Sequence, residues 1–250
     1  LTQADMKSHN AICEALESTR LPILSEEGKG IAFEKRKHGK QFWLVDPLDG
    51  TKEFINRNGE FTVNIALVDD GRVTAGVVYV PAQDTLYFGC LEDGCWKSTD
   101  GENLVPIEVR KADHERGLTV VMSRSHPSPE LTKYLQEIKV AEALPVGSSL
   151  KLCVVAEGKA DLYPRLGPTM EWDTAAGQAV LEAMRGRFDQ VALDAAGWTW
   201  SGHGYFDANF GTRALEEDFS YWTWGRFPTG GGSTCFYDAT LLDGPEFINQ

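Results

Sequence analysis

A buried strand that ends in two closely spaced carboxylates is the feature that most constrains how this chain folds. Residues 42–45 form an uninterrupted apolar run, followed directly by Asp46-Pro47-Leu48-Asp49-Gly50-Thr51. Continuous apolar runs are typical of strands that are covered on both faces. The proline and glycine of this hexapeptide predict a turn at the strand end. Asp46 and Asp49 are therefore expected to lie close together.

Two neighbouring carboxylates repel each other unless a proton or a cation lies between them. Mg²⁺ suits such a pair, because it binds a few carboxylates together with phosphate oxygens of a substrate. The next residues, 51–54, predict a short helix, and the N–H groups of Gly50 and Thr51 at its start could bind a phosphate. An Asp-rich turn that only caps a helix fits the same spacing. The spacing alone leaves both interpretations open.

Three further acidic residues lie at the ends of predicted helices and strands. Taken singly, Glu26 predicts an exposed acidic loop, whereas Asp5 and Asp173 predict helix N-caps. Together with the central turn they form an acidic group that suits a phosphoesterase with two or three metal ions. Its members are Asp5, Glu26, Asp46, Asp49 and Asp173.

The remaining pattern predicts an α+β or layered α/β fold. Residues 61–68 and 73–80 alternate apolar and polar side chains around Asp69-Asp70-Gly71, which predicts a β-hairpin. Residues 85–90 and 94–97 extend it into an antiparallel meander. Further strands are expected at residues 118–122 and 160–163. Helices are expected at residues 4–18, 130–138, 148–157 and 174–184, the last with Gly186 as its C-cap.

The charged stretch at residues 110–117 predicts a boundary between two parts of the chain. Residues 1–115 would form an N-terminal α+β metal-binding part, and residues 116–250 a C-terminal α/β part. The second part carries an atypical insertion near residues 201–234, rich in Trp and Gly. We interpret it as a long aromatic loop with no evident chemistry.

Composition excludes several classes of protein. With 250 residues and 42% apolar residues, the chain can form a core, and it has no apolar run long enough for a transmembrane helix. Its net charge of −13 argues against binding a nucleic-acid polymer. Five cysteines without paired spacing favour a reducing compartment such as the cytoplasm. The first residues do not predict a signal peptide, and a start inside a longer protein is expected because no Met begins the sequence.

Several segments together resemble the inositol monophosphatase superfamily of Mg²⁺-dependent, lithium-sensitive phosphatases, with an αβαβα sandwich fold. The resemblance covers residues 1–186, and Lys52-Glu53-Phe54 favours the branch of bacterial 3′(2′),5′-bisphosphate nucleotidases. Superfamily members usually have about two further helices before the segment that matches Leu1. The matching segments are residues 24–27, 43–54, 58–67, 123–126, 147–151 and 172–177.

The resemblance implies a role for each site residue. Two or three Mg²⁺ ions would be bound by Glu26, Asp46, the Leu48 carbonyl, Asp49 and Asp173. Catalytic roles would fall to Glu26 and Thr51, which orient the attacking water, with Asp5 in support. The substrate would be bound by Gly50, Thr51, Lys52, His126, Ser148, Lys151, Arg165 and Asp173. For Lys151 an exposed helix cation, and for His126 a loop histidine, are equally open interpretations.

The implied reaction is hydrolysis of the 3′-phosphate of adenosine 3′,5′-bisphosphate to AMP by metal-activated water. A second phosphate on the substrate requires cations in an otherwise acidic protein. An inositol- or sugar-phosphate phosphatase of the same superfamily is the alternative, and a non-catalytic phosphometabolite-binding protein is a third. A homodimer and peripheral association with the inner face of the membrane are left open.

Overall fold

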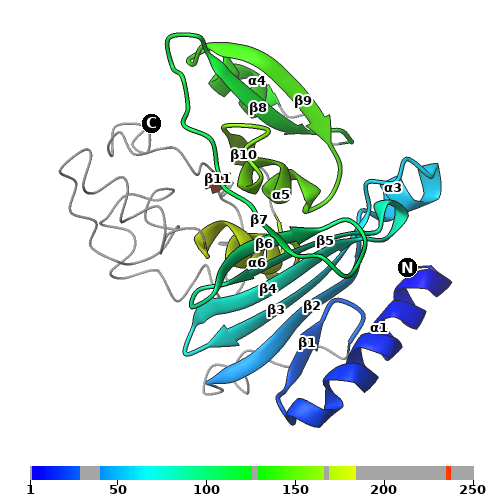
Figure 1. Ribbon diagram of the computed structural model, residues 1–250. Coiled ribbons are helices and arrows are strands. Elements are labelled where there is room, and N and C mark those ends of the chain that lie inside the picture. Colours follow the sequence, from blue (N-terminus) through cyan, green and yellow to red (C-terminus); the bar gives the residue numbers. More distant parts are fainter. Residues whose placement is uncertain (1, 29–39, 126–128, 166–168, 184–234, 238–250) are drawn as a thin grey trace.

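The computed structural model describes residues 2–28, 40–125, 129–165, 169–183 and 235–237 (Figure 1). Its main element is a seven-stranded sheet in the order β1-β2-β3-β4-β5-β6-β7, antiparallel except for the β1–β2 pair. The strands are β1 (Ile23–Ser25), β2 (Gln41–Asp49), β3 (Thr62–Asp69), β4 (Arg72–Val80), β5 (Thr85–Cys90), β6 (Gly94–Ser98) and β7 (Val105–Pro106).

The meander predicted from alternation is confirmed in β3 to β6. Along β3, buried residues alternate with half-buried ones over the whole strand, as a period of two requires. Asp70 and Gly71 both have positive φ, 50° and 81°, between the paired residues Asp69 and Arg72. Two such residues form the turn whose twist matches that of paired strands, which explains the Asp-Gly sequence at this hairpin.

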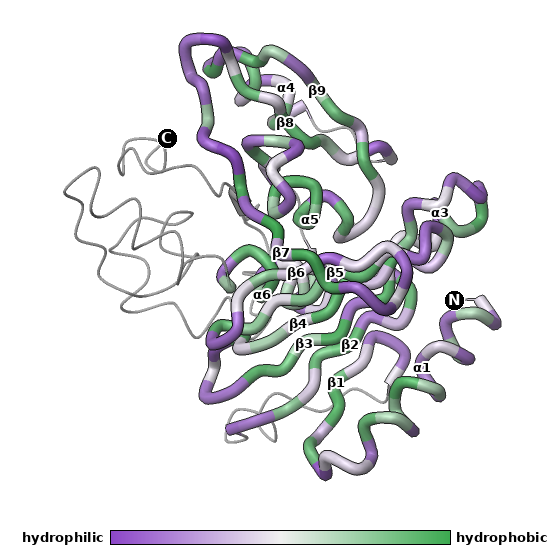
Figure 2. Tube along the Cα trace, viewed as in Figure 1, coloured by the Kyte–Doolittle hydropathy of each residue, from purple (hydrophilic) through white to green (hydrophobic). Residues whose placement is uncertain are grey.

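Helix α6 (Glu171–Glu182) packs across β3, β4 and β5, and α5 (Leu150–Ala156) packs against α6 (Figure 1). The contact is close because two strand residues lack side chains. A Cβ at Gly89 would lie 2.5 Å from the Ala179 carbonyl oxygen, and one at Gly76 would lie 2.7 Å from the Ala176 oxygen. Apolar residues concentrate along the central strands and α6, whereas the strand ends are hydrophilic (Figure 2).

A second, smaller layer follows the large sheet. Strand β8 (Leu118–Ser123) pairs in parallel with β9 (Val140–Val146), and α4 (Pro129–Leu135) connects them. Strand β10 (Tyr163–Arg165) pairs with β11 (Cys235–Tyr237). Helix α1 (Gln3–Leu16) lies beside β2, and short 3₁₀ turns occur at Glu17–Thr19 and Pro81–Gln83.

Some local expectations were wrong. Asp5 and Asp173 are not N-caps: each is the third residue of its helix and accepts from the backbone N–H of the capping residue, Thr2 or Met170. The strand expected at residues 160–163 begins at Tyr163, and β9 was not expected, because its half-exposed pattern lacks alternation. Gly186 and the insertion near 201–234 lie outside the described residues, as do most of residues 29–40.

No helix in the described part of the chain is long and apolar enough to cross a membrane.

Candidate active site

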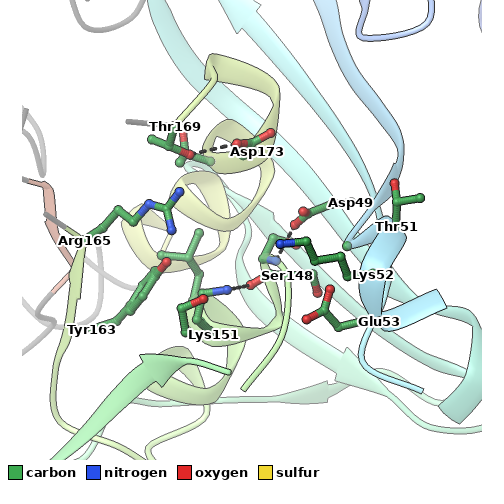
Figure 3. Close-up of a pocket in the computed structure, with 15 residues that line it drawn as sticks. Asp49, Thr51, Lys52, Glu53, Ser148, Lys151, Tyr163, Arg165, Thr169 and Asp173 are labelled. Carbon is green, nitrogen blue, oxygen red and sulfur yellow. Dashed lines mark hydrogen bonds between the residues drawn. The ribbon is translucent and has the colours of Figure 1, made fainter. Parts of the chain in front are cut away.

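A pocket of about 250 Å³ lies where the end of β2 meets α5, α6 and β10 (Figure 3). Eight residues predicted for the site line it: Asp49, Gly50, Thr51, Lys52, Ser148, Lys151, Arg165 and Asp173. Acidic side chains come from the end of β2, the start of α6 and α3 (Thr51–Asn56), whereas cationic ones come from α3, α5 and β10. One cavity therefore combines groups that could bind a metal ion with groups that could bind an anion.

A bulge in β2 places the two central carboxylates on the same side of the sheet. Asp46 pairs with Asn64 and Asp49 with Thr62, so three residues of β2 span the distance of two residues of β3. In a regular strand, residues three apart would point to opposite faces. The extra residue falls at Pro47-Leu48, where the missing N–H of proline suits an interrupted ladder.

These carboxylates are held in an environment that disfavours their charge. Burial, followed by the charges of Asp49 and Glu26, raises the pKa of Asp46 well above its usual range. Burial and the charge of Asp173 raise the pKa of Asp49 to about 7. The pKa of Glu26 is also raised, by loss of water and by Asp173 and Asp5, against a hydrogen bond with Asp46. All five acidic residues predicted for the site therefore interact electrostatically.

The donor set fits a hard divalent cation. Within the described residues, no three Asp, Glu, His or Cys side chains form a ready-made cage for a metal ion. Mg²⁺ does not need one, because it keeps several waters and uses one or two carboxylates together with substrate oxygens. Burial first, and neighbouring carboxylates second, raise the pKa of Asp46 and of Asp49, and a bound cation would offset both effects. Leu48 is buried, and its N–H donates to Asp46 Oδ1 over 3.0 Å.

Lys151 is a buried cation, not the exposed helix lysine that was an open interpretation. Its side chain is 6% exposed, donates to the Ser148 carbonyl oxygen, and lies with Nζ 5.4 Å from the centre of the Tyr163 ring. Burial lowers its pKa to about 8, against the attraction of Asp49. Because Arg165 also lowers this pKa, the two cations share one region of the pocket.

The start of α3 brings backbone groups to the same cavity. Gly50 caps this helix with φ of 88°, where a Cβ would lie 3.1 Å from Ser148 Cβ. Only glycine combines this conformation with such close approach. Thr51 and Lys52 follow it in α3 and also line the pocket.

Three residues that sequence reasoning missed also hold the site together. The Ser149 N–H donates to Asp49 Oδ2 over 2.5 Å, and Thr169 Oγ1 donates to Asp173 Oδ2 over 2.8 Å. Tyr163 supplies the ring next to Lys151. Thr169 lies only four residues before Asp173, so this contact is local in the sequence. The contacts of Ser149 and Tyr163 join elements far apart in sequence and leave no local signal. His126 lies outside the described residues.

The fold and this site define a family of phosphatases. Residues 1–216 match the model of the inositol monophosphatase family, and the chain belongs to that family.

Among the relatives it resembles is the 3′(2′),5′-bisphosphate nucleotidase CysQ of Salmonella typhimurium, 51% identical over 185 residues, which are 73% of each chain. The crystal structure of CysQ from Bacteroides thetaiotaomicron is 45% identical, with a TM-score of 0.66 and 72% of each chain covered. A structure of SaIMPase-II with bound inositol monophosphate is 27% identical, with a TM-score of 0.61, covering 72% of this chain and 69% of that one. The layered α/β fold predicted from the sequence is confirmed by these structures.

Proposed function

We propose that this chain hydrolyses the 3′-phosphate of adenosine 3′,5′-bisphosphate to give AMP. The observation that carries the proposal is the pocket itself, where Asp49 and Asp173 face the same cavity as Lys151 and Arg165. A substrate with two phosphates needs both regions, one to react at the carboxylates and one to neutralise the second dianion. The relative CysQ of Salmonella typhimurium is named a 3′(2′),5′-bisphosphate nucleotidase, which supports a bisphosphate substrate.

Mg²⁺ is the proposed cofactor, held by Glu26, Asp46, Asp49, Asp173 and the Leu48 carbonyl. When bound, it would neutralise the phosphate and lower the pKa of a water molecule. The raised pKa values of Asp46 and Asp49 support a cation at this place.

The chain's own residues would orient the reactants. Glu26 and Thr51 would accept hydrogen bonds from the attacking water and fix its direction, since in-line attack depends on position. Asp5, 2% exposed and interacting with Glu26, would support that carboxylate. The N–H groups of Gly50 and Thr51 would donate to the reacting phosphate.

The second phosphate would lie at the cationic end of the pocket. Arg165 can bind it with two parallel hydrogen bonds, and Lys151 adds a point charge. Lys52 also lines the pocket and can donate to phosphate oxygens, whereas Ser148, whose hydroxyl donates to the Glu60 carbonyl oxygen, can accept from a ribose hydroxyl. His126 stays a proposed nucleoside contact.

The alternative substrate is an inositol or sugar phosphate. The SaIMPase-II structure with inositol monophosphate favours it, because that relative shares the fold. A compact monophosphate would fill the carboxylate end and leave Lys151 and Arg165 without a phosphate. Lithium sensitivity, a place in the cytoplasm and a homodimer also belong to the proposal.

A substrate panel tests these functions. Turnover of adenosine 3′,5′-bisphosphate, inositol 1-phosphate and fructose 1,6-bisphosphate is compared with Mg²⁺ and with EDTA. We expect the first to be the best substrate, with activity lost in EDTA and reduced by millimolar Li⁺. A preference for inositol 1-phosphate would support the alternative, and binding without turnover of any of the three would support a phosphometabolite-binding protein.

A further inference from the structure

We propose that Glu60, held by Arg124, is a positioning residue that fixes the turn at Gly147–Ser149 against the substrate pocket. The proposal rests on the proposed function, because the turn serves a substrate only if that pocket binds one. Neither residue lines the pocket, and neither was among the predicted site residues.

Glu60 connects three segments that are distant in sequence. It lies between α3 and β3, whereas Arg124 follows β8 and Gly147 follows β9. Arg124 donates through Nε and Nη2 to the two carboxylate oxygens, over 2.8 and 2.7 Å. The Gly147 N–H donates to Oε2 of the same carboxylate over 2.7 Å. One carboxylate therefore joins the large sheet to the β8–β9 layer.

Arg124 is itself fixed to the chain just before the turn. Its Nη2 donates to the Pro145 carbonyl oxygen over 2.6 Å, and its backbone N–H donates to the Val146 oxygen over 3.2 Å. Burial alone would raise the pKa of Glu60, but the hydrogen bonds from Arg124 and Gly147 outweigh it and lower that pKa. The ion pair thus keeps Glu60 charged and oriented towards the turn.

The turn needs such support because its central residue is strained. Ser148 has a φ of 47°, in the left-handed region that residues other than glycine rarely adopt. Such conformations persist when the surroundings hold them, and they cluster at ligand-binding sites. Glu60 accepts two hydrogen bonds from the turn: its side chain accepts from the Gly147 N–H, and its backbone carbonyl oxygen accepts from the Ser148 hydroxyl.

The strained turn places groups that the proposed reaction uses. Its Ser148 carbonyl oxygen accepts from Lys151, and its Ser149 N–H donates to Asp49. A Cβ at Gly147 would lie 2.5 Å from the Glu53 side chain, so the turn also packs closely on α3. Lys151 follows the turn by two residues, whereas Asp49 lies on β2. Loosening Glu60 would therefore displace Lys151 more than Asp49.

The test compares Glu60→Ala, Glu60→Gln and Arg124→Ala with the wild type. We expect Glu60→Ala to raise KM for adenosine 3′,5′-bisphosphate about tenfold, the effect of losing a charge-assisted contact, and to change kcat much less. Glu60→Gln, which can still accept from the Gly147 N–H, should recover part of that loss. Hydrogen exchange at the amides of residues 147–149 should become faster in the Ala variant.

Asp161→Asn is the matched control. Asp161 accepts two hydrogen bonds of 2.6 Å from Arg110 and one from a backbone N–H, like Glu60, but it is not among the residues that line the pocket. This variant should lower Tm and leave KM unchanged. A similar rise in KM in Glu60→Ala and in Asp161→Asn would overturn the proposal. Unchanged KM and unchanged hydrogen exchange in Glu60→Ala would also overturn it.

Failure of the proposed function gives a different result. If the wild type does not hydrolyse the bisphosphate, the function is wrong, and calorimetric binding of inorganic phosphate replaces KM in the same comparison. Weaker phosphate binding with faster exchange in Glu60→Ala would still support the positioning role. Unchanged phosphate binding would overturn it.

Discussion

Asp46 combines burial with close carboxylate neighbours: it is 1% exposed and lies near Asp49 and Glu26. A carboxylate kept at such a place destabilises the metal-free fold, because its charge is neither solvated nor paired. The proposed Mg²⁺ would supply the opposite charge that this carboxylate lacks. The charge of Asp46 therefore affects both the chemistry of the site and the stability of the fold.

The variant Asp46→Asn tests this account. We expect kcat/KM to fall at least about hundredfold, since one amide oxygen replaces a charged ligand. The metal-free Tm should stay the same or rise, because a buried charge is removed. Enzyme kinetics and calorimetry measure the two effects, with Glu92→Gln, at an exposed hairpin residue, as the control. A variant with normal activity would exclude Asp46 as a ligand.

Lys151 and Arg165 are expected to decide substrate choice. Lys151→Met and Arg165→Ala should each lower kcat/KM for adenosine 3′,5′-bisphosphate about ten- to hundredfold, because a contact with a charged phosphate is lost. Inositol 1-phosphate, with no second phosphate, should be affected much less. Lys97→Met, whose lysine pairs with Glu157 at another place, is the control. Equal losses on both substrates would instead favour the inositol phosphatase alternative.

Asp161 predicts a pH dependence of stability. Burial acts to raise its pKa, but hydrogen bonds from Arg110 and Thr119 outweigh burial and lower it. The folded protein therefore keeps this carboxyl ionised at pH values where the unfolded chain, with a pKa of about 3.9, takes up a proton. The stabilisation that the Asp161 carboxylate gives the folded protein is complete above its pKa in the unfolded chain. This stabilisation is lost as the pH falls through its pKa in the folded protein.

We therefore expect the difference in Tm between wild type and Asp161→Asn to be largest near pH 6 and to shrink as the pH falls below about 4. Thermal unfolding from pH 2.5 to pH 7 measures it. A difference that stays constant with pH would show that packing, and not the ion pair, is what the substitution removes.

At the scale of single elements, the position of α6 couples the core to the site. The helix carries Asp173 at its start and rests on β5 where Gly89 leaves room for its backbone. Because helix and strand backbones are in contact there, a small shift of the helix also moves the carboxylate. Core packing and site geometry are thus properties of the same element.

The variant Gly89→Ala should lower the free energy of unfolding by about 1–3 kcal/mol, as overpacking does. Its Cβ would lie 2.5 Å from backbone atoms of Ala179 and Val180, which cannot rotate away. Chemical denaturation measures this change, and Mg²⁺ affinity should fall with it because Asp173 moves. Cys90→Ala, at the next residue on the opposite face, is the control. An unchanged free energy of unfolding in Gly89→Ala would contradict this prediction, because it would show that α6 can move away from β5 without loss of stability.

At the scale of the whole molecule, a strongly acidic chain concentrates part of its charge around one pocket. The net charge is −13, and five carboxylates interact at the candidate metal site. Ligands that bind only the folded state stabilise it in proportion to the logarithm of their concentration over Kd. Metal binding should therefore be visible as stability even without substrate.

We expect Mg²⁺ at a hundredfold excess over its Kd to add about 2.7 kcal/mol. For a chain of this size that corresponds to roughly 2–4 °C in Tm per kcal/mol. EDTA should reverse the shift and abolish phosphatase activity. Differential scanning calorimetry with Mg²⁺, and with Na⁺ at equal ionic strength, makes the comparison. Equal shifts with both salts, or full activity in EDTA, would contradict the metal site.

The division of the chain near residues 110–117 remains a prediction. The structure shows a large sheet before this stretch and the β8–β9 layer after it. The pocket draws residues from both sides, so the two layers are needed together whether or not they fold separately.

The sequence by itself determined the antiparallel meander of β3 to β6 and the hairpin between β3 and β4. Alternation reports which face of a strand is buried, and Asp70-Gly71 specifies its turn locally. Several short motifs together, including the one around Asp46 and Asp49, pointed to the family to which the chain belongs. Such signals are contained within a few neighbouring residues.

Only the tertiary structure decided how these residues meet. The β2 bulge turns Asp46 and Asp49 to one side, which their spacing of three residues would not predict. Lys151 becomes a buried pocket cation because α5 packs between α6 and β10. Glu60 meets Arg124 across 64 residues of chain. Contacts between residues so far apart in the sequence depend on how whole layers pack, so no local sequence pattern predicts them.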